Sequence, residues 1–308
     1  MLYLFLLLII GFVLLVKGAD VFVDSAAGVA RRFKIPPIII GTTIVAIGTS
    51  APEAAISIVA ALKGADGVSV GNVIGSNITN ILLILGATAL IGALPIQKNT
   101  KLYELPFVGF ITILLGVFGL SLGEISRPAA SILLGLFVVF LAYMLIMALH
   151  NKQTENNEIA PIGVGKAIFL MIAGISALVY GSDMIVDSAT GIAKLFGVSD
   201  RIIGLTLIAL GTSLPELVVC VTAALKREYD LAIGNIVGSN IFNILFVLGL
   251  AAAIRPIPFK TAFLTDTAVA LGAVVLLIMF TWRNSKLSRF GGAVLLSSYI
   301  AYTFYLVL

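Results

Sequence analysis

Residues 41–53 read GTTIVAIGTSAPE, and residues 204–216 read GLTLIALGTSLPE. A second pair of segments, GNVIGSNITN at 71–80 and GNIVGSNIFN at 234–243, has the same spacing of 163 residues (204 − 41 = 163 and 234 − 71 = 163). The first pair places a glutamate inside strongly apolar sequence, where a carboxylate is costly. A costly feature that occurs twice indicates one site, formed where two related halves of the chain meet.

The composition is typical of a membrane protein. Hydrophobic residues make up 60% of the 308 residues, charged residues make up 11%, and the mean hydropathy is +1.16. A soluble domain carries roughly 25% charged residues. Apolar stretches long enough to cross about 30 Å of hydrocarbon recur along the whole chain. We therefore expect an all-α polytopic membrane protein, because a β-barrel would show alternating segments of about 10 residues.

Ten transmembrane spans are predicted from the apolar stretches. The only clearly polar connection, HNKQTENNEIAP at 150–161, separates spans five and six and is too short for a soluble regulatory domain. The predicted organisation is a five-helix repeat at 1–149, a linker at 150–162 and a second five-helix repeat at 163–308. The predicted spans are 2–29, 35–62, 69–93, 103–121, 127–149, 163–190, 199–225, 232–254, 263–281 and 287–306.

Lysine and arginine residues indicate the orientation of the chain in the cell membrane. Twelve of them lie in connections after odd-numbered spans and six after even-numbered spans. Cytoplasmic loops are enriched in these residues, so we expect a cytoplasmic linker and two extracellular termini. The same residues account for the net charge of +4, which therefore indicates topology and not a nucleic-acid partner. Because each repeat has an odd number of spans, the repeats are predicted to be inverted, as in many secondary transporters.

The first motif lies midway along span two. Pro52 lacks a backbone N–H and is expected to open the helix, which would free carbonyl groups such as that of Ala46 for a cation. Ser50 and Glu53 also fit a capping box that would start a new half-helix. A simple kink explains one such motif, but an inverted pair favours a functional site. The oxygen-bearing residues of span two and their counterparts in span seven are Ala46, Thr49, Ser50 and Glu53, then Ala209, Thr212, Ser213 and Glu216.

The second motif combines small residues, which let helices approach closely, with hydroxyl and amide side chains. Polar adhesion between helices is the alternative function, and it is as well supported as ion binding for Asn77 and Asn240. Asn72 and Asn235 lie nearer the helix start and are predicted to be caps. The candidate ligands are Ser76 and Asn80 in span three, with Ser239 and Asn243 in span eight. The predicted fold has broken helices two, three, seven and eight around an ion site at the midplane.

Together the motifs form an all-oxygen donor set, which disfavours soft transition metals. Ca²⁺ takes about 6–8 oxygen ligands, and two glutamates match its charge. The remaining oxygens offer smaller subsites for Na⁺, and competition for shared carboxylates is a basis for antiport. An enzyme is not predicted, because the chain carries no nucleophile–base set, HExxH motif or phosphate-binding glycine loop. A cation channel remains a remote alternative.

At these residues the chain resembles the sodium/calcium exchanger family, within the cation/calcium antiporter superfamily. GTSAPE with GNVIGSN, and GTSLPE with GNIVGSN, are similar to that family's α-repeats. The resemblance implies exchange of Ca²⁺ for Na⁺ by alternating access, with no cofactor and no soluble regulatory domain. We also expect a functional monomer, because the two antiparallel halves complete one pathway.

The resemblance implies a role for each candidate residue. Glu53 and Glu216 would be the central Ca²⁺ ligands, with Asn80 and Asn243 in the middle of the cluster. Thr49 and Thr212 would belong to the same site. The flanking Na⁺ sites would comprise Ser50, Ser213, Ser76, Ser239 and the carbonyl groups of Ala46 and Ala209.

One position departs from the family pattern. Many members of the family have an acidic residue at the position of Asn243, whereas both repeats of this chain carry asparagine. A third carboxylate is therefore missing, and with it one route to H⁺ or K⁺ dependence. Coupling to H⁺ or K⁺ instead of Na⁺ nevertheless stays open, because two carboxylates can also carry protons.

Overall fold

The computed structural model describes residues 2–65, 67–150, 163–196 and 209–307, and these residues are almost entirely helical. Each half begins with a helix of 32 residues, α1 (Leu2–Phe33) and α9 (Val164–Leu195). The first half continues with α2 (Pro37–Ile40), η1 (Gly41–Val45), α3 (Ala46–Thr49), α4 (Ala51–Lys63), α5 (Val68–Ile78), η2 (Thr79–Leu85), α6 (Gly86–Ile91), β1 (Leu94–Pro95), η3 (Thr100–Glu104), α7 (Leu105–Leu122), β2 (Glu124–Ile125) and α8 (Arg127–His150).

The second half repeats this order of elements. It continues with α11 (Ala209–Gly211), α12 (Leu214–Leu225), α13 (Tyr229–Phe242), η5 (Asn243–Leu248), α14 (Gly249–Ile254), β3 (Ile257–Pro258), α15 (Thr261–Trp282), β4 (Lys286–Leu287) and α16 (Arg289–Val307). The elements labelled η are π-helical segments, which lie within longer helices.

Among the described residues, seven helices are long and apolar enough to cross a membrane, and one bent pair of helices makes an eighth span. The multi-pass, all-α prediction is thereby confirmed. Two of the ten predicted spans do not meet this criterion. The seventh, 199–225, lies partly outside the described residues, and its described part is α11 and α12. The tenth is occupied by α16, a helix of 19 residues.

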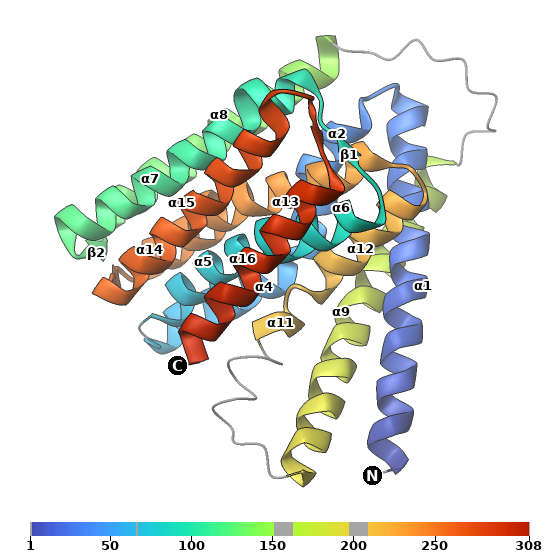
Figure 1. Cartoon of the computed structure of the whole chain (residues 1–308), viewed down its shortest axis with the longest axis horizontal. Helices are drawn as coiled ribbons and strands as arrows, with labels where there is room; N and C mark the ends of the chain where they lie inside the picture. The colour runs from blue at the N-terminus through green and yellow to red at the C-terminus, as the bar shows by residue number, and fades with distance from the viewer. Residues whose placement is uncertain (1, 66, 151–162, 197–208, 308) are drawn as a thin grey trace.

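The helices α1 and α9 pack against each other and extend to one side of the remaining helices (Figure 1). A Cβ atom on Gly11 would lie 2.9 Å from the carbonyl oxygen of Gly181, and one on Gly18 would lie 2.9 Å from that of Gly174. Residue numbers rise along α1 as they fall along α9, so the two helices are antiparallel. Because they hold equivalent places in the two repeats, the repeats are inverted, as the loop charges predicted.

Two short antiparallel strand pairs connect loops of the two halves. The strand β1 pairs with β4, and β2 pairs with β3. The strands β1 and β4 follow predicted spans three and nine, whereas β2 and β3 follow spans four and eight. Each pair therefore joins loops that are predicted to lie on the same side of the membrane. Adding 163 to β1 gives β3, and adding 162 to β2 gives β4, so the two pairs are related by the repeat to within one residue.

Spans three and eight differ from the prediction, which treated them as broken. Helices Val68–Ile91 and Tyr229–Ile254 are each continuous, and each contains a π-helical segment, η2 or η5. Neither helix contains a proline, so no backbone N–H is missing and the helical hydrogen bonds continue. The extra residue of a π-segment rotates the side chains that follow it, and such segments are frequent at functional sites.

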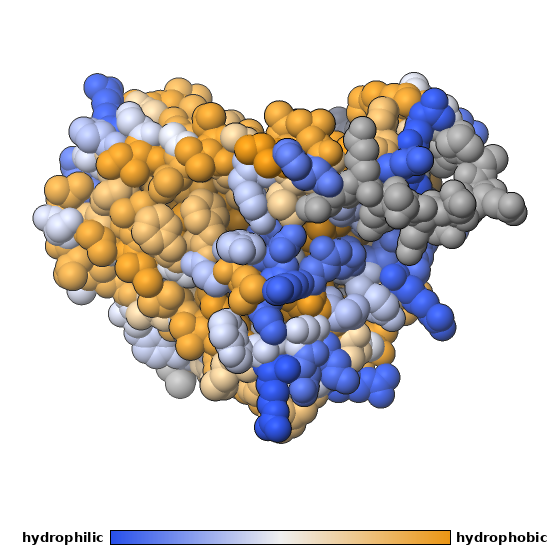
Figure 2. All heavy atoms as spheres, turned by 90° about the horizontal axis from the view of Figure 1, so that it is seen from above, coloured by the Kyte–Doolittle hydropathy of each residue, from blue (hydrophilic) through white to orange (hydrophobic). Residues whose placement is uncertain are grey.

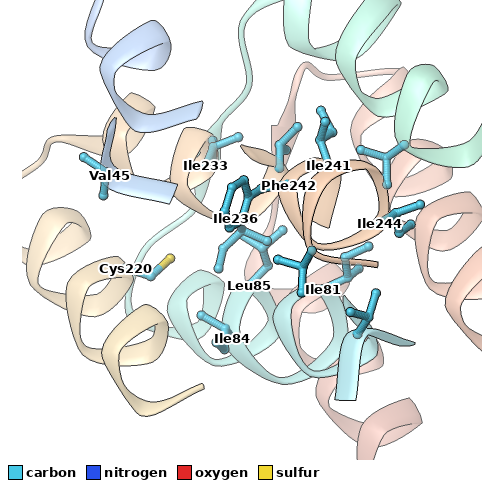
Figure 3. Packing of buried hydrophobic residues seen from close by; sticks show 14 of the residues in the cluster. Val45, Ile81, Ile84, Leu85, Cys220, Ile233, Ile236, Ile241, Phe242 and Ile244 are labelled. Atoms are coloured by element: carbon cyan, nitrogen blue, oxygen red, sulfur yellow. The ribbon is translucent and has the colours of Figure 1, made fainter. Parts of the chain in front are cut away.

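These two continuous helices form the centre of the molecule. In their most apolar parts 72% and 83% of residues are buried, compared with 22% for α1, which lies at the periphery. Figure 3 shows Ile84 and Leu85 of η2 close to Ile236 of α13 and Cys220 of α12. Cys220 is fully buried and packs within this core. Large hydrophobic side chains cover one flank of the surface in Figure 2, a composition suited to lipid.

Candidate functional site

The second span breaks where the first motif predicts a break. The helix Pro37–Thr49 and the helix Ala51–Lys63 meet at Ser50 with a bend of 49°. Pro52 lies in the first turn of α4, where its missing N–H costs least. The bend brings Glu53 into the protein interior, with only 1% of its surface exposed. The equivalent Glu216 lies in the first turn of α12 and is equally buried.

The capping box that Ser50 and Glu53 were predicted to form is absent. Ser50 makes no side-chain capping hydrogen bond, because its backbone (φ −86°, ψ 11°) lies outside the extended region usual for an N-cap. Its hydroxyl instead donates to Oε1 of Glu216 at 2.9 Å, across 166 residues of sequence. This contact brings the motif of the first repeat to the carboxylate of the second.

The environment of Glu53 is formed by both repeats. Ser76 of α5 approaches its Oε1 with a hydroxyl at 3.4 Å, and the hydroxyls of Thr212 and Ser213 also face this carboxylate. The Ser213 hydroxyl has no well-formed hydrogen bond, whereas its counterpart Ser50 does. The two halves of the site are therefore similar in composition but differ in their hydrogen bonds.

Four asparagines form a symmetric cluster between the central helices. The amides of Asn77 and Asn240 donate to each other's backbone carbonyl, at 3.1 and 3.4 Å. Asn80 donates to Oδ1 of Asn240 at 3.0 Å, and Asn243 donates to Oδ1 of Asn77 at 3.2 Å. Every bond of this cluster has its equivalent at the offset of 163. Asn77 and Asn240 thus orient Asn80 and Asn243, which supports the structural alternative for the first two residues.

Asn72 and Asn235 lie at the site, so their assignment as helix caps was wrong. Asn235 is fully buried, and its Oδ1 accepts a hydrogen bond from the Thr49 hydroxyl at 2.9 Å. Asn72 donates to the carbonyl oxygen of Glu53 at 3.1 Å and to the hydroxyl of Ser57 at 3.0 Å. The sequence signal for this role was that both repeats carry asparagine at this position. A surface residue that only caps a helix could differ between the repeats, because several residue types can cap a helix.

The carbonyl of Ala46 was predicted to be free, and it is not. It accepts hydrogen bonds from the Ser50 N–H at 3.0 Å and the Thr49 hydroxyl at 3.3 Å. The residue that loses its donor to Pro52 is Gly48, four positions earlier, because the helical bond runs from residue i to i−4. The counterpart Ala209 begins α11, and Thr212 is half-buried between α11 and α12.

Several buried oxygens at the site have no hydrogen-bond partner among the described residues. Such groups are costly unless a ligand, ion or water satisfies them. The unpartnered oxygens belong to residues of both motifs and both repeats: Oε2 of Glu53 and Glu216, Oδ1 of Asn80 and Asn243, and Oγ of Ser213 and Ser239. This set contains two glutamate carboxyl oxygens and four amide or hydroxyl oxygens, a composition that suits a hard cation such as Ca²⁺ or Na⁺.

The single histidine and the single cysteine of the chain lie outside the site. His150 ends α8 on the surface and contacts the carbonyl oxygen of Ile146 at 2.9 Å. Cys220, one turn beyond Glu216, is buried against Thr88 and does not contribute an atom to the site.

Comparison with known proteins extends over nearly the whole chain. A family model described as sodium/calcium exchanger protein matches residues 3–146 and 166–308. The sodium/calcium exchanger MaX1 of Methanosarcina acetivorans is 33% identical over 338 residues, which cover 97% of this chain and 97% of MaX1. The Ca²⁺/H⁺ antiporter ChaA of Bacillus subtilis is 26% identical over 288 residues, which cover 85% of this chain and 81% of ChaA.

A solved structure of the sodium-calcium exchanger NCX_Mj has the same fold. It matches with a TM-score of 0.87 and 34% identity, and the match covers 99% of this chain and 100% of that one. The whole arrangement of helices, and not only the two motifs, is therefore shared with that exchanger.

Proposed function

The chain belongs to the sodium/calcium exchanger family, and on that premise we propose that it exchanges Ca²⁺ for Na⁺ across the cell membrane by alternating access. The family consists of antiporters rather than enzymes. The observation that carries the proposal is the hydrogen bond from Ser50 to Glu216, because it joins the buried carboxylate of one repeat to the broken helix of the other.

In this mechanism Glu53 and Glu216 bind Ca²⁺ at the centre of the molecule. Their two charges neutralise one Ca²⁺, and the unpartnered oxygens of Asn80 and Asn243 offer further ligands. Na⁺ ions compete for the same carboxylates. The proposed flanking ligands are the hydroxyls of Ser76, Ser239, Ser50, Ser213, Thr49 and Thr212 and the carbonyl group of Ala209. A site that carries two buried negative charges is costly to reorient empty, so ions of one kind replace the other.

The proposed setting of this mechanism follows the sequence prediction. Residues 1–149 and 163–308 act as the two repeats, and 150–162 form a cytoplasmic linker. Both termini lie outside the cell. One chain contains both halves of the pathway and works as a monomer, without a cofactor or a soluble regulatory domain.

Coupling to H⁺ is the second candidate, and the relative named Ca²⁺/H⁺ antiporter favours it. Two buried carboxylates can exchange protons as well as cations. The asparagines at 80 and 243 favour Na⁺, because they leave no third carboxylate for a proton.

Uptake of ⁴⁵Ca²⁺ into vesicles that contain the purified protein tests these proposals. We expect an outward Na⁺ gradient to drive uptake, and outward H⁺ or K⁺ gradients to drive little. Glu53→Gln and Glu216→Gln should each abolish uptake, while Glu124→Gln in β2, far from the two motifs in sequence, should leave it unchanged. If only the H⁺ gradient drives uptake, the coupling ion is H⁺ and not Na⁺. Uptake that persists in the Glu53 and Glu216 variants would refute the site, and flux that needs no counter-ion gradient would refute antiport.

A further inference from the structure

Ion pairs hold α1 against the loop between α12 and α13. Nζ of Lys226 lies 2.6 Å from Oδ1 of Asp20 and 2.6 Å from Oδ1 of Asp24. It also donates a hydrogen bond to the Asp20 carbonyl oxygen at 3.2 Å. Burial alone would lower the pKa of Lys226, but the hydrogen bonds and charges of both aspartates raise it, so this lysine stays protonated. Arg31 adds a pair with Glu228 at 2.9 Å.

The repeat places the same three charged residues in the other half of the chain. Subtracting 163 from Lys226 gives Lys63, and adding 163 to Asp20 and Asp24 gives Asp183 and Asp187. Lys63 is the last residue of α4, directly before the loop that leads to α5, and its side chain is exposed. Within the part of the chain that the structure describes, Lys63 forms no ion pair. Asp183 and Asp187 are exposed on α9 beside each other's like charge.

The packing of helices shows the same difference between the halves. The helix α1 packs closely along α12, the helix that ends just before Lys226. The equivalent contact, between α9 and α4, is slight or absent. The pair of helices α1 and α9 is therefore docked on one side of the molecule and undocked on the other.

We propose that two ion-pair latches close alternately during transport. The Lys226 latch consists of Lys226, Asp20 and Asp24, and the Lys63 latch consists of Lys63, Asp183 and Asp187. Because α1 and α9 are joined through close glycine contacts, they move as one unit. In inverted repeats, exchanging the conformations of the two halves gives the opposite-facing state. In that state Lys63 binds Asp183 and Asp187, and Lys226 is released.

The two latches differ in strength. Arg31 and Glu228 strengthen the Lys226 side. The counterpart of Glu228 is Ala65, which carries no charge and so cannot accept an equivalent of the Arg31–Glu228 pair. The state with a closed Lys226 latch is therefore favoured when no ion gradient acts. This inference rests on the proposed antiport, because only alternating access requires both states.

Crosslinking in a Cys220→Ser background tests the latches. One variant carries Asp24→Cys with Lys226→Cys, and a second carries Asp187→Cys with Lys63→Cys. A short bifunctional methanethiosulfonate should crosslink each pair in reconstituted protein. A variant that carries all four cysteine substitutions should form either the 24–226 crosslink or the 63–187 crosslink in each molecule, and not both. Adding Lys226→Gln to the second variant should raise its crosslinking about two- to tenfold, since exposed ion pairs contribute modestly. Lys166→Gln, which removes a charge from α9 outside the latch, should have no such effect.

Three outcomes would overturn the proposal: no crosslink in the second variant under any Na⁺ or Ca²⁺ condition, both crosslinks in the same molecule, or an equal effect of Lys166→Gln. Uptake of ⁴⁵Ca²⁺ by the unsubstituted protein separates this failure from failure of the proposed function. Normal Na⁺-driven uptake without alternate crosslinking refutes the latches alone. Absent uptake refutes the antiport, whatever crosslinks form.

Discussion

Asn80 and Asn243 contribute oxygen atoms to the centre of the site without adding charge. Each donates its amide to an asparagine of the other repeat, which leaves its own Oδ1 buried and unpartnered. The negative charge of the site is therefore limited to Glu53 and Glu216. This limit matches one Ca²⁺, and it leaves no additional carboxylate that a proton could occupy.

The residue pattern predicts that Asn243→Asp makes transport sensitive to pH. A third carboxylate beside two buried ones favours protonation, because like charges in a buried site repel. We expect ⁴⁵Ca²⁺ uptake by this variant to fall about tenfold between pH 8 and pH 6, relative to the unsubstituted protein. The counterpart Asn80→Asp should behave in the same way, and Asn243→Gln should show no added pH dependence. Equal pH profiles for all four proteins would contradict the prediction.

Among the elements, the helix breaks were only partly predictable from sequence. Pro52 marks a break that the structure contains, since a missing N–H acts locally. The π-segments η2 and η5 contain no proline or other residue that would predict a departure from the α-helix. They recur at the repeat offset and contain Asn80 and Asn243. Their position depends on how the two central helices pack, so no local residue pattern indicated them.

The antiparallel contact of α1 and α9 depends on glycines at their crossing. A Cβ on Gly11 would lie 2.9 Å from a backbone oxygen of Gly181 and 2.9 Å from Ile185, so Gly11→Ala should force the helices apart. Overpacking of this kind costs about 1–3 kcal/mol. We expect a lower melting temperature in detergent and slower ⁴⁵Ca²⁺ uptake. In α8, Gly135→Ala is the control, because a Cβ there meets nothing within 4 Å. Equal losses in both variants would show that the close contact is unimportant.

For the whole molecule, the strand pairs connect loops that the charge bias assigns to the same membrane side. The pair β1–β4 lies between loops after odd-numbered spans, and β2–β3 between loops after even-numbered spans. The pairing of the loops therefore agrees with their predicted membrane sides. It does not fix which side is cytoplasmic, and that prediction can be measured directly.

The predicted orientation can be measured with single cysteines in a Cys220→Ser background. Ser121→Cys lies in the last turn of α7, at the end of span four, and Asn284→Cys lies in the loop after span nine; both residues are exposed. A membrane-impermeant maleimide should label the first variant in intact cells and the second only after permeabilisation. The reverse pattern would invert the assignment and place both termini in the cytoplasm.

The sequence by itself determined the membrane class, the two repeats, their inversion and the residue types of the site. Composition, loop charge and a fixed offset of 163 residues carry these properties, because each depends on local chemistry or on simple counting. The tertiary structure decided which side chains meet. Ser50 was predicted to cap its own helix, yet it binds Glu216 of the other repeat.

The tertiary structure also decided where the two similar halves differ. Both halves carry the same lysine and the same two aspartates, so these three residues do not indicate which set is paired. Only Lys226 is paired with its aspartates among the described residues, because α1 and α9 form one unit that packs closely on α12 and has slight or no contact with α4. Nearly symmetric sequence thus adopts an asymmetric structure, since one rigid pair of helices is docked on one side only.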